Sequence, residues 1–184
     1  MTAPKRPALS SILLHWTVAV GVAGMLAFGY WISTLPKGPG KTDYVQLHKS
    51  FGMIVLILAS ARVLWRLRVG FPAPIGRAWE RGAARASHGL LIALTLVLPL
   101  SGVVRSLTYA RPVAVFGLPV IPQMLAEKNV RLNEIAGAVH DACALALAML
   151  IVLHVAVAAK HHFVDRDDTL KRMRPMARGA AEGR

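Results

Sequence analysis

Five of the seven histidines in this chain lie inside or at the edge of long apolar stretches, where side chains that bind metals or carry protons are unexpected. These residues are His15, His48, His88, His140 and His154. An ionisable side chain inside an apolar span is costly, so each of them is a candidate functional residue. A single histidine in such a place more often serves as a hydrogen-bonded packing residue, but five together favour a ligating role.

The spacing of these histidines predicts two sites at different depths. His140 and His154 are fourteen residues apart, which on an α-helix is a rise of about 21 Å and about 40° short of four full turns. Both side chains therefore lie on one helix face, one near each surface of a hydrocarbon layer ~30 Å thick. His48 lies at the depth of His140 and forms the outer pair with it. At the inner surface His154 has two candidate partners, His15 and His88, and spacing does not choose between them.

The number of ligands at each depth favours haem over a bare metal ion. Two or three histidines are too few for a closed zinc site, which takes four protein ligands. Haem iron already has four porphyrin nitrogens, so two axial imidazoles complete a six-coordinate centre suited to electron transfer. Gly52 and Gly137, each about one turn from a histidine, leave room for a macrocycle or for close helix packing. The alternative from another class is a haem-free, histidine-lined metal or proton transporter.

Four elements must position these side chains, and each has the composition of a membrane-spanning helix. Apolar residues make up 55% of the chain and charged residues 17%, with a mean hydropathy of +0.49, which is typical of membrane proteins. We expect helices at about residues 9–35, 44–65, 86–104 and 135–159, separated by segments rich in proline and glycine. The predicted fold class is all-α, an integral membrane four-helix bundle over residues 1–164 with a tail over residues 165–184.

The basic residues predict how the bundle is oriented. The formal charge of +13 does not indicate nucleic-acid binding, because Lys and Arg are confined to short segments between long uncharged runs. Residues 1–8, 62–85 and 160–184 together hold fifteen of the 22 basic residues. Since cytoplasmic segments keep Lys and Arg, we expect both termini and the tail over residues 165–184 to be cytoplasmic.

Several short motifs together resemble the bacterial cytochrome b-561 family, in an order and spacing that cover nearly the whole chain. They are LHW at residues 14–16, LHKSFG at 47–52, SHGL at 87–90, LPLSG at 98–102, AAKHHF at 158–163 and DRDDTL at 165–170. One departure is that the family often has tyrosine a turn after the histidine of the third helix, where this chain has Ala93.

The resemblance implies two haem b groups in a multi-pass protein of the bacterial inner membrane. The family's axial ligands fall on His15 and His154 for the inner haem, and on His48 and His140 for the outer haem. It also implies electron exchange with ubiquinone, and for some members oxidation of superoxide at the outer face. A second implied function is that of a cytochrome b subunit that accepts electrons from a partner dehydrogenase or hydrogenase.

Two further features bear on these substrates. His161 and His88 are candidates for a quinone site, since an interfacial histidine can bond a quinone carbonyl and relay a proton. Alternatively, Lys160, His161 and His162 only anchor the helix end among the head groups of membrane lipid. The outer segments carry seven basic and four acidic residues, and their net charge of +3 would attract an anion such as superoxide.

Substituting one histidine of each implied pair should separate the two haems. We expect His140→Ala to lose the outer haem and His154→Ala to lose the inner haem, because a bis-histidine iron needs both axial nitrogens. Each variant should hold about half the haem of the unsubstituted protein. The pyridine haemochromogen spectrum measures haem per protein, and full haem content in both variants would contradict the pairing.

Overall fold

The computed structural model describes residues 8–71, 77–167 and 170–173, and most of these residues are helical. Its elements, in chain order, are α1 (Leu9–Thr34), α2 (Pro39–Val69), α3 (Ala78–Thr108), β1 (Val113–Val115), β2 (Leu118–Ile121), α4 (Val130–Phe163) and the short 3-10 helix η1 (Lys171–Met173). Each of the four long helices is long and apolar enough to cross a membrane. The predicted four-helix membrane fold is confirmed.

Three of the helices extend further than the sequence predicted. α2, α3 and α4 each begin before and end after the ranges expected from the apolar stretches. Hydropathy marks only the part of a helix that lies in hydrocarbon, whereas Lys, Arg, Glu and Gln are good helix formers that continue it into the interface. Local signals support the earlier starts: Pro39 occupies the first turn of α2, and the Asn129 side chain accepts a hydrogen bond from Leu132 N at the start of α4.

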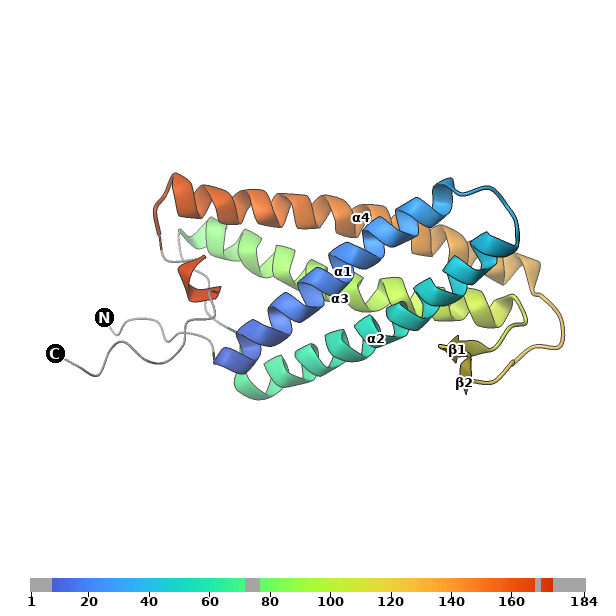
Figure 1. Ribbon diagram of the computed structural model, residues 1–184. Coiled ribbons are helices and arrows are strands. Elements are labelled where there is room, and N and C mark those ends of the chain that lie inside the picture. The colour runs from blue at the N-terminus through green and yellow to red at the C-terminus, as the bar shows by residue number, and fades with distance from the viewer. Residues whose placement is uncertain (1–7, 72–76, 168–169, 174–184) are drawn as a thin grey trace.

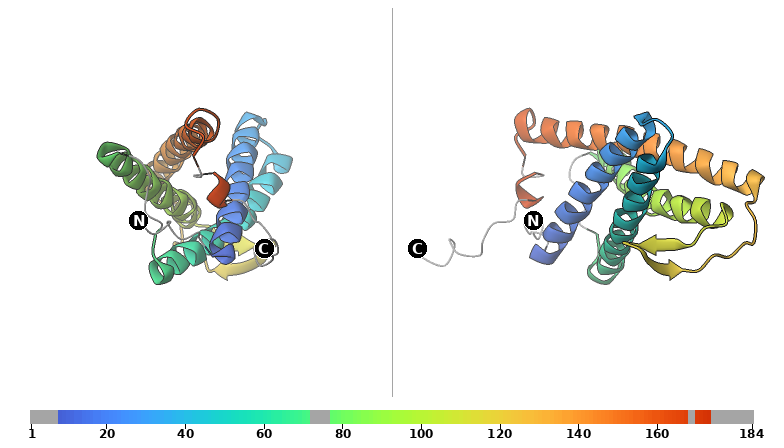
Figure 2. Two further views of the ribbon diagram at one scale, coloured as in Figure 1. Left: turned by 90° about the vertical axis from the view of Figure 1, so that its left-hand side faces the viewer. Right: turned by 45° about the vertical axis from the view of Figure 1, so that its right-hand side comes forward.

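The helices form two antiparallel pairs that are inclined to one another. α1 packs mainly against α2 and α3 mainly against α4, while α2 also contacts α3 (Figure 1). Val18, Val22, Ala59 and Leu147 form the buried cluster between the pairs. We call the end of the bundle that carries β1 and β2 the hairpin end, and the end that carries η1 the η1 end. Figure 2 views the bundle from the η1 end in its left panel, where η1 lies close to the start of α1.

The exterior of the bundle is apolar and part of its interior is polar. Val20, Leu145 and Val152 are each more than 60% exposed, whereas Ser11 and Ser101 are buried. Lipid tails solvate exposed apolar side chains, and small polar residues inside a bundle let helices approach and hydrogen-bond. The surface is therefore suited to contact with lipid.

A short β-hairpin, which the sequence did not predict, covers part of the hairpin end. β1 and β2 pair antiparallel, and the turn between them has positive φ angles at Phe116 and Gly117. The hairpin is held against α2 by a hydrogen bond from Phe116 N to Ser50 Oγ of 2.9 Å and by the ring contact of Phe116 with Phe51. The strands are too short, and too rich in proline and glycine around them, to stand out from a loop in the sequence.

The segment after α4 returns to the bundle. Trp16 Nε1 donates a hydrogen bond of 2.8 Å to the carbonyl oxygen of Met173, which joins η1 to α1. The first part of the predicted tail is therefore packed against a helix. Residues 1–7 and 72–76 of the predicted bundle, and residues 168–169 and 174–184 of the predicted tail, lie outside the described residues.

Candidate functional site

At the hairpin end, His48 of α2 and His140 of α4 face one another across the bundle. Their ring centroids are 6.4 Å apart. A metal-bound imidazole nitrogen lies about 2.0–2.1 Å from the metal, so two rings on opposite sides of one metal have centroids roughly 6 Å apart. The two imidazoles are thus separated by about the distance that a shared iron atom requires.

The hydrogen bonds of His140 leave its other ring nitrogen available. Nδ1 of His140 lies 3.1 Å from the carbonyl oxygen of Leu98 and 3.1 Å from Ser101 Oγ. Because a carbonyl oxygen only accepts, Nδ1 carries the proton and Nε2 keeps its lone pair. This is the usual arrangement of a metal-binding histidine, whose second nitrogen donates to a backbone carbonyl.

Two glycines make room for these imidazoles. A Cβ atom at Gly29 would lie 3.0 Å from Cε1 of His48, and one at Gly102 would lie 3.2 Å from Cε1 of His140. Gly52 lines the same cavity as both histidines, as the haem-space interpretation of that glycine requires. At Gly137, by contrast, a Cβ atom would lie in ordinary contact with the guanidinium of Arg105, at 3.5 Å, and not against a histidine ring. Gly137 is also not among the residues that line the cavity of His48 and His140.

At the η1 end, three histidines from three helices converge. The rings of His88 on α3 and His154 on α4 have centroids 5.4 Å apart. His15 on α1 contacts Arg62, whose Nη2 lies 3.1 Å from His15 Nδ1. His15 is also near enough to interact electrostatically with both other histidines. In the structure the ring of His154 thus contacts that of His88, whereas the family resemblance implies His15 as the second axial ligand beside His154.

The two candidate partners of His154 differ in what their second ring nitrogen contacts. The ring of His88 is hydrogen-bonded to the backbone of Ala84, as ligating histidines commonly are. Arginine can only donate, so Nδ1 of His15 accepts from Arg62 and a neutral ring carries its proton on Nε2. Arg62 must leave Nδ1 of His15 before that ring can present an unprotonated Nε2 to a metal.

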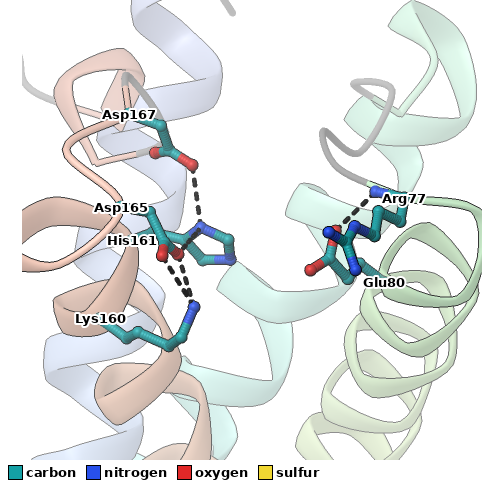
Figure 3. A network of polar contacts seen from close by, with 6 residues as sticks. All are labelled: Arg77, Glu80, Lys160, His161, Asp165 and Asp167. Atoms are coloured by element: carbon teal, nitrogen blue, oxygen red, sulfur yellow. Dashed lines mark hydrogen bonds and ion pairs between the residues drawn. The ribbon is translucent and has the colours of Figure 1, made fainter.

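The candidate quinone residue His161 belongs to a polar network at the C-terminal end of α4 (Figure 3). Its Nδ1 lies 2.8 Å from Asp167 Oδ2 and 3.1 Å from Asp165 Oδ2, and Lys160 Nζ lies 2.7 Å from Asp165 Oδ2. Two carboxylates thus lie close to the ring, but Nδ1 of His161 is buried and forms no hydrogen bond within the described residues. His161 follows His154 by seven residues on α4, which places it about two turns nearer the end of that helix.

Imidazoles that face one another at both ends of an apolar four-helix bundle are the arrangement of a membrane haem protein. The model of the family described as prokaryotic cytochrome b561 matches residues 8–176. This chain belongs to that family, and it is accordingly a membrane electron-transfer protein that binds b-type haem.

Three relatives match the chain over almost its full length. Cytochrome b561 homolog 2 of Escherichia coli (strain K12) is 38% identical over 173 residues, which is 92% of each chain. Cytochrome b561 homolog 1 of the same organism is 29% identical over 175 residues, covering 90% of this chain and 95% of the relative. The probable superoxide oxidase CybB of Yersinia pestis is 28% identical over 181 residues, covering 95% of this chain and 99% of the relative.

Reasoning from sequence missed some residues that support the histidines. Gly29 carries no local signal, because its contact is with a residue on the next helix. Ser101 and Gly102 lie in the LPLSG stretch, but only the fold shows that both contact His140. The role of Arg62 beside His15 was likewise not visible from spacing.

Enlarging Gly29 should disturb the site at the hairpin end. We expect Gly29→Val to push the ring of His48 away from His140, because even a Cβ atom would come within 3.0 Å of that ring. The matched control is Gly24→Val on the same helix, where nothing lies within 4 Å of the ideal Cβ position. Haem content per protein should fall in Gly29→Val alone, and equal haem content in both variants would show that His48 needs no such space.

Proposed function

We propose that this protein is a di-haem cytochrome that carries electrons from superoxide at the hairpin end to ubiquinone at the η1 end. The observation that carries the proposal is the placement of facing imidazoles at both ends of one bundle, with α4 contributing His140 to one and His154 to the other. A bound haem with two histidine ligands supplies one-electron transfer and offers no free coordination position to oxygen. The likeness to the probable superoxide oxidase CybB supports the choice of substrate.

The choice of axial ligands is supported by geometry at one end and by resemblance at the other. His48 and His140 would hold the outer haem, at the hairpin end. His15 and His154 would hold the inner haem, at the η1 end, with His88 beside them. The donor set fits the group, since imidazole is an established axial ligand of haem iron.

We place the η1 end on the cytoplasmic side of the bacterial inner membrane. Six arginines lie where α2 ends and α3 begins, both at this end: Arg62, Arg66, Arg68, Arg77, Arg81 and Arg85. Cytoplasmic segments keep such residues. The hairpin end then faces the periplasm.

A cluster of cations beside the outer histidines supports superoxide as the donor. Lys49 Nζ donates a hydrogen bond of 3.0 Å to Ser106 Oγ, and the lysine lies within electrostatic range of Arg105 and Arg111. Lys49 also lines the cavity that contains His48 and His140. A positive field in a low-dielectric setting raises the local concentration of a small anion and its rate of encounter.

The network around His161 supports quinone reduction at the other end. His161 lies beside two carboxylates at the end of α4, and its imidazole can bind a quinone carbonyl and pass on a proton. Quinone reduction consumes protons, and a histidine at the cytoplasmic interface can take them from water. His161 would thus bind the head group and deliver a proton to it.

Substitution can decide whether His15 or His88 is the second axial ligand of the inner haem, beside His154. We expect His15→Ala to lose the inner haem and His88→Ala to retain it, because the proposed axial pair is His15 with His154. Haem content and the redox titration of the reduced α-band report the loss. The reverse result would assign the inner haem to His88, the residue whose ring is 5.4 Å from that of His154.

The superoxide reaction predicts a salt-dependent effect of Arg111. In stopped-flow mixing with superoxide, Arg111→Glu should slow haem reduction several-fold at low ionic strength, and the difference should shrink as salt screens the charge. Lys37→Glu, which makes the same charge change at an exposed position before α2, is the control. No haem reduction by superoxide in the unsubstituted protein, with a dehydrogenase that co-purifies, would instead favour a subunit of that dehydrogenase.

The quinone role predicts a selective loss in His161→Gln. We expect ubiquinone reduction to slow by about 100-fold, a typical contribution of a proton-transferring residue, with haem content unchanged. His162→Gln makes the same change one residue further along the same helix end, outside the contacts of His161 with Asp165 and Asp167, and should leave the rate near normal. Equal rates in the two variants would mean that this helix end only anchors the protein among lipid head groups.

A further inference from the structure

Two arginines of α2, Arg62 and Arg66, lie one turn apart near the histidines of the η1 end. Arg66 is only 8% exposed, although guanidinium groups are charged under all physiological conditions. Within residues 8–71, 77–167 and 170–173, neither arginine has an acidic partner, whereas Lys160 and Arg105 do. The two cations are also close enough to repel one another.

Such an arrangement is unfavourable unless an anion joins it. Removing a cation from water is unfavourable in general, and an opposite charge with good hydrogen bonds is what offsets that cost. Among the described residues, Nε of Arg62 is buried and has no hydrogen-bond partner, while its Nη2 lies 3.1 Å from Nδ1 of His15. Arg62 therefore has an unused donor inside the protein, next to the buried Arg66.

The position of the pair indicates which anion this is. Arg62 lies within electrostatic range of all three histidines of the η1 end, and Arg66 within range of His15. An anion bound by both guanidiniums would lie next to the proposed axial ligands. A b-type haem carries two propionate carboxylates, and arginine binds carboxylates through paired N–H donors.

We propose that Arg62 and Arg66 bind the propionate carboxylates of the inner haem. The proposal rests on the proposed function, because it requires haem at the η1 end. Two guanidiniums match two carboxylates in number and charge. A lipid phosphate is a poorer match, because lipid surrounds the outside of the helices whereas Arg66 is buried and Arg62 contacts His15.

The same step accounts for the contact between Arg62 and His15. While Arg62 donates to Nδ1 of His15, the neutral ring keeps its proton on Nε2 and cannot ligate through that atom. When Arg62 turns to a propionate, Nδ1 can take the proton and Nε2 becomes an electron-pair donor. Binding of the carboxylate and release of the axial nitrogen are thus two results of one side-chain movement.

Infrared spectroscopy of the haem-loaded protein tests the proposal directly. Cells fed 5-aminolevulinic acid with a 13C-labelled carboxyl group place the label in the haem propionates. Redox difference spectra of the purified protein then contain carboxylate bands that shift with the label. We expect these bands to change frequency in Arg62→Gln and Arg66→Gln, because the carboxylates lose a charged donor.

Arg68→Gln is the matched control, since it removes the same charge from the same end of α2 at an exposed position. Its labelled bands should coincide with those of the unsubstituted protein. The propionates of the outer haem are labelled too, but they contribute equally to the spectra of the variant and of the unsubstituted protein, so they do not affect the comparison. Arg62→Lys covers the case in which the glutamine variant does not fold: it keeps the charge but not the forked donors, so the bands should still shift.

Labelled bands that are identical in all variants would overturn the assignment of the two arginines. Loss of only the inner haem in Arg62→Gln, with full haem in Arg68→Gln, would support it. A colourless unsubstituted protein is a different result, because it would contradict the proposed function itself before any question about the arginines arises.

Discussion

The arrangement of this protein depends on one helix, α4, presenting two imidazoles to the bundle interior at two depths. His140 reaches His48 near one end, and His154 reaches His88 and lies within electrostatic range of His15 at the other. In lipid no apolar driving force sorts helices, so small residues and polar contacts between helices decide how they pack. The glycines opposite His48 and His140 and the buried serine beside His140 are of this kind. Packing and ligand geometry are therefore set by the same contacts.

The two ends of the bundle place cations differently around their histidines. At the hairpin end, Lys49 is bonded to Ser106 and Arg105 is 3.9 Å from Asp141, so these charges have partners within the protein or access to water. At the η1 end, Arg66 and the Nε atom of Arg62 are buried, and neither arginine has a carboxylate partner in the described part of the chain. The first arrangement suits a diffusing anion that must arrive and leave. The second suits an anion that stays, because a buried charge is stabilised only by a partner held in fixed geometry.

Family membership and the local structure answer different questions. Membership in the prokaryotic cytochrome b561 family establishes a membrane electron-transfer protein with b-type haem. The hydrogen bonds of His140 hold its ring so that one nitrogen remains free, and His161 lies with two carboxylates close to its ring. The substrates and the number of haems are proposals built on those contacts.

The sequence by itself determined that four apolar stretches become membrane helices and that His140 and His154 share one helix face, since both follow from length and helical period. The lengths of α2, α3 and α4 were underestimated, because hydropathy does not mark the polar turns beyond the hydrocarbon, and the β-hairpin was missed. Only the packing of the helices decided that Gly29 adjoins His48, that Arg105 lies beside Gly137 and that Arg62 contacts His15. These contacts join residues on different helices, and the relative rotation and tilt of helices come from packing, which no local pattern in the chain records.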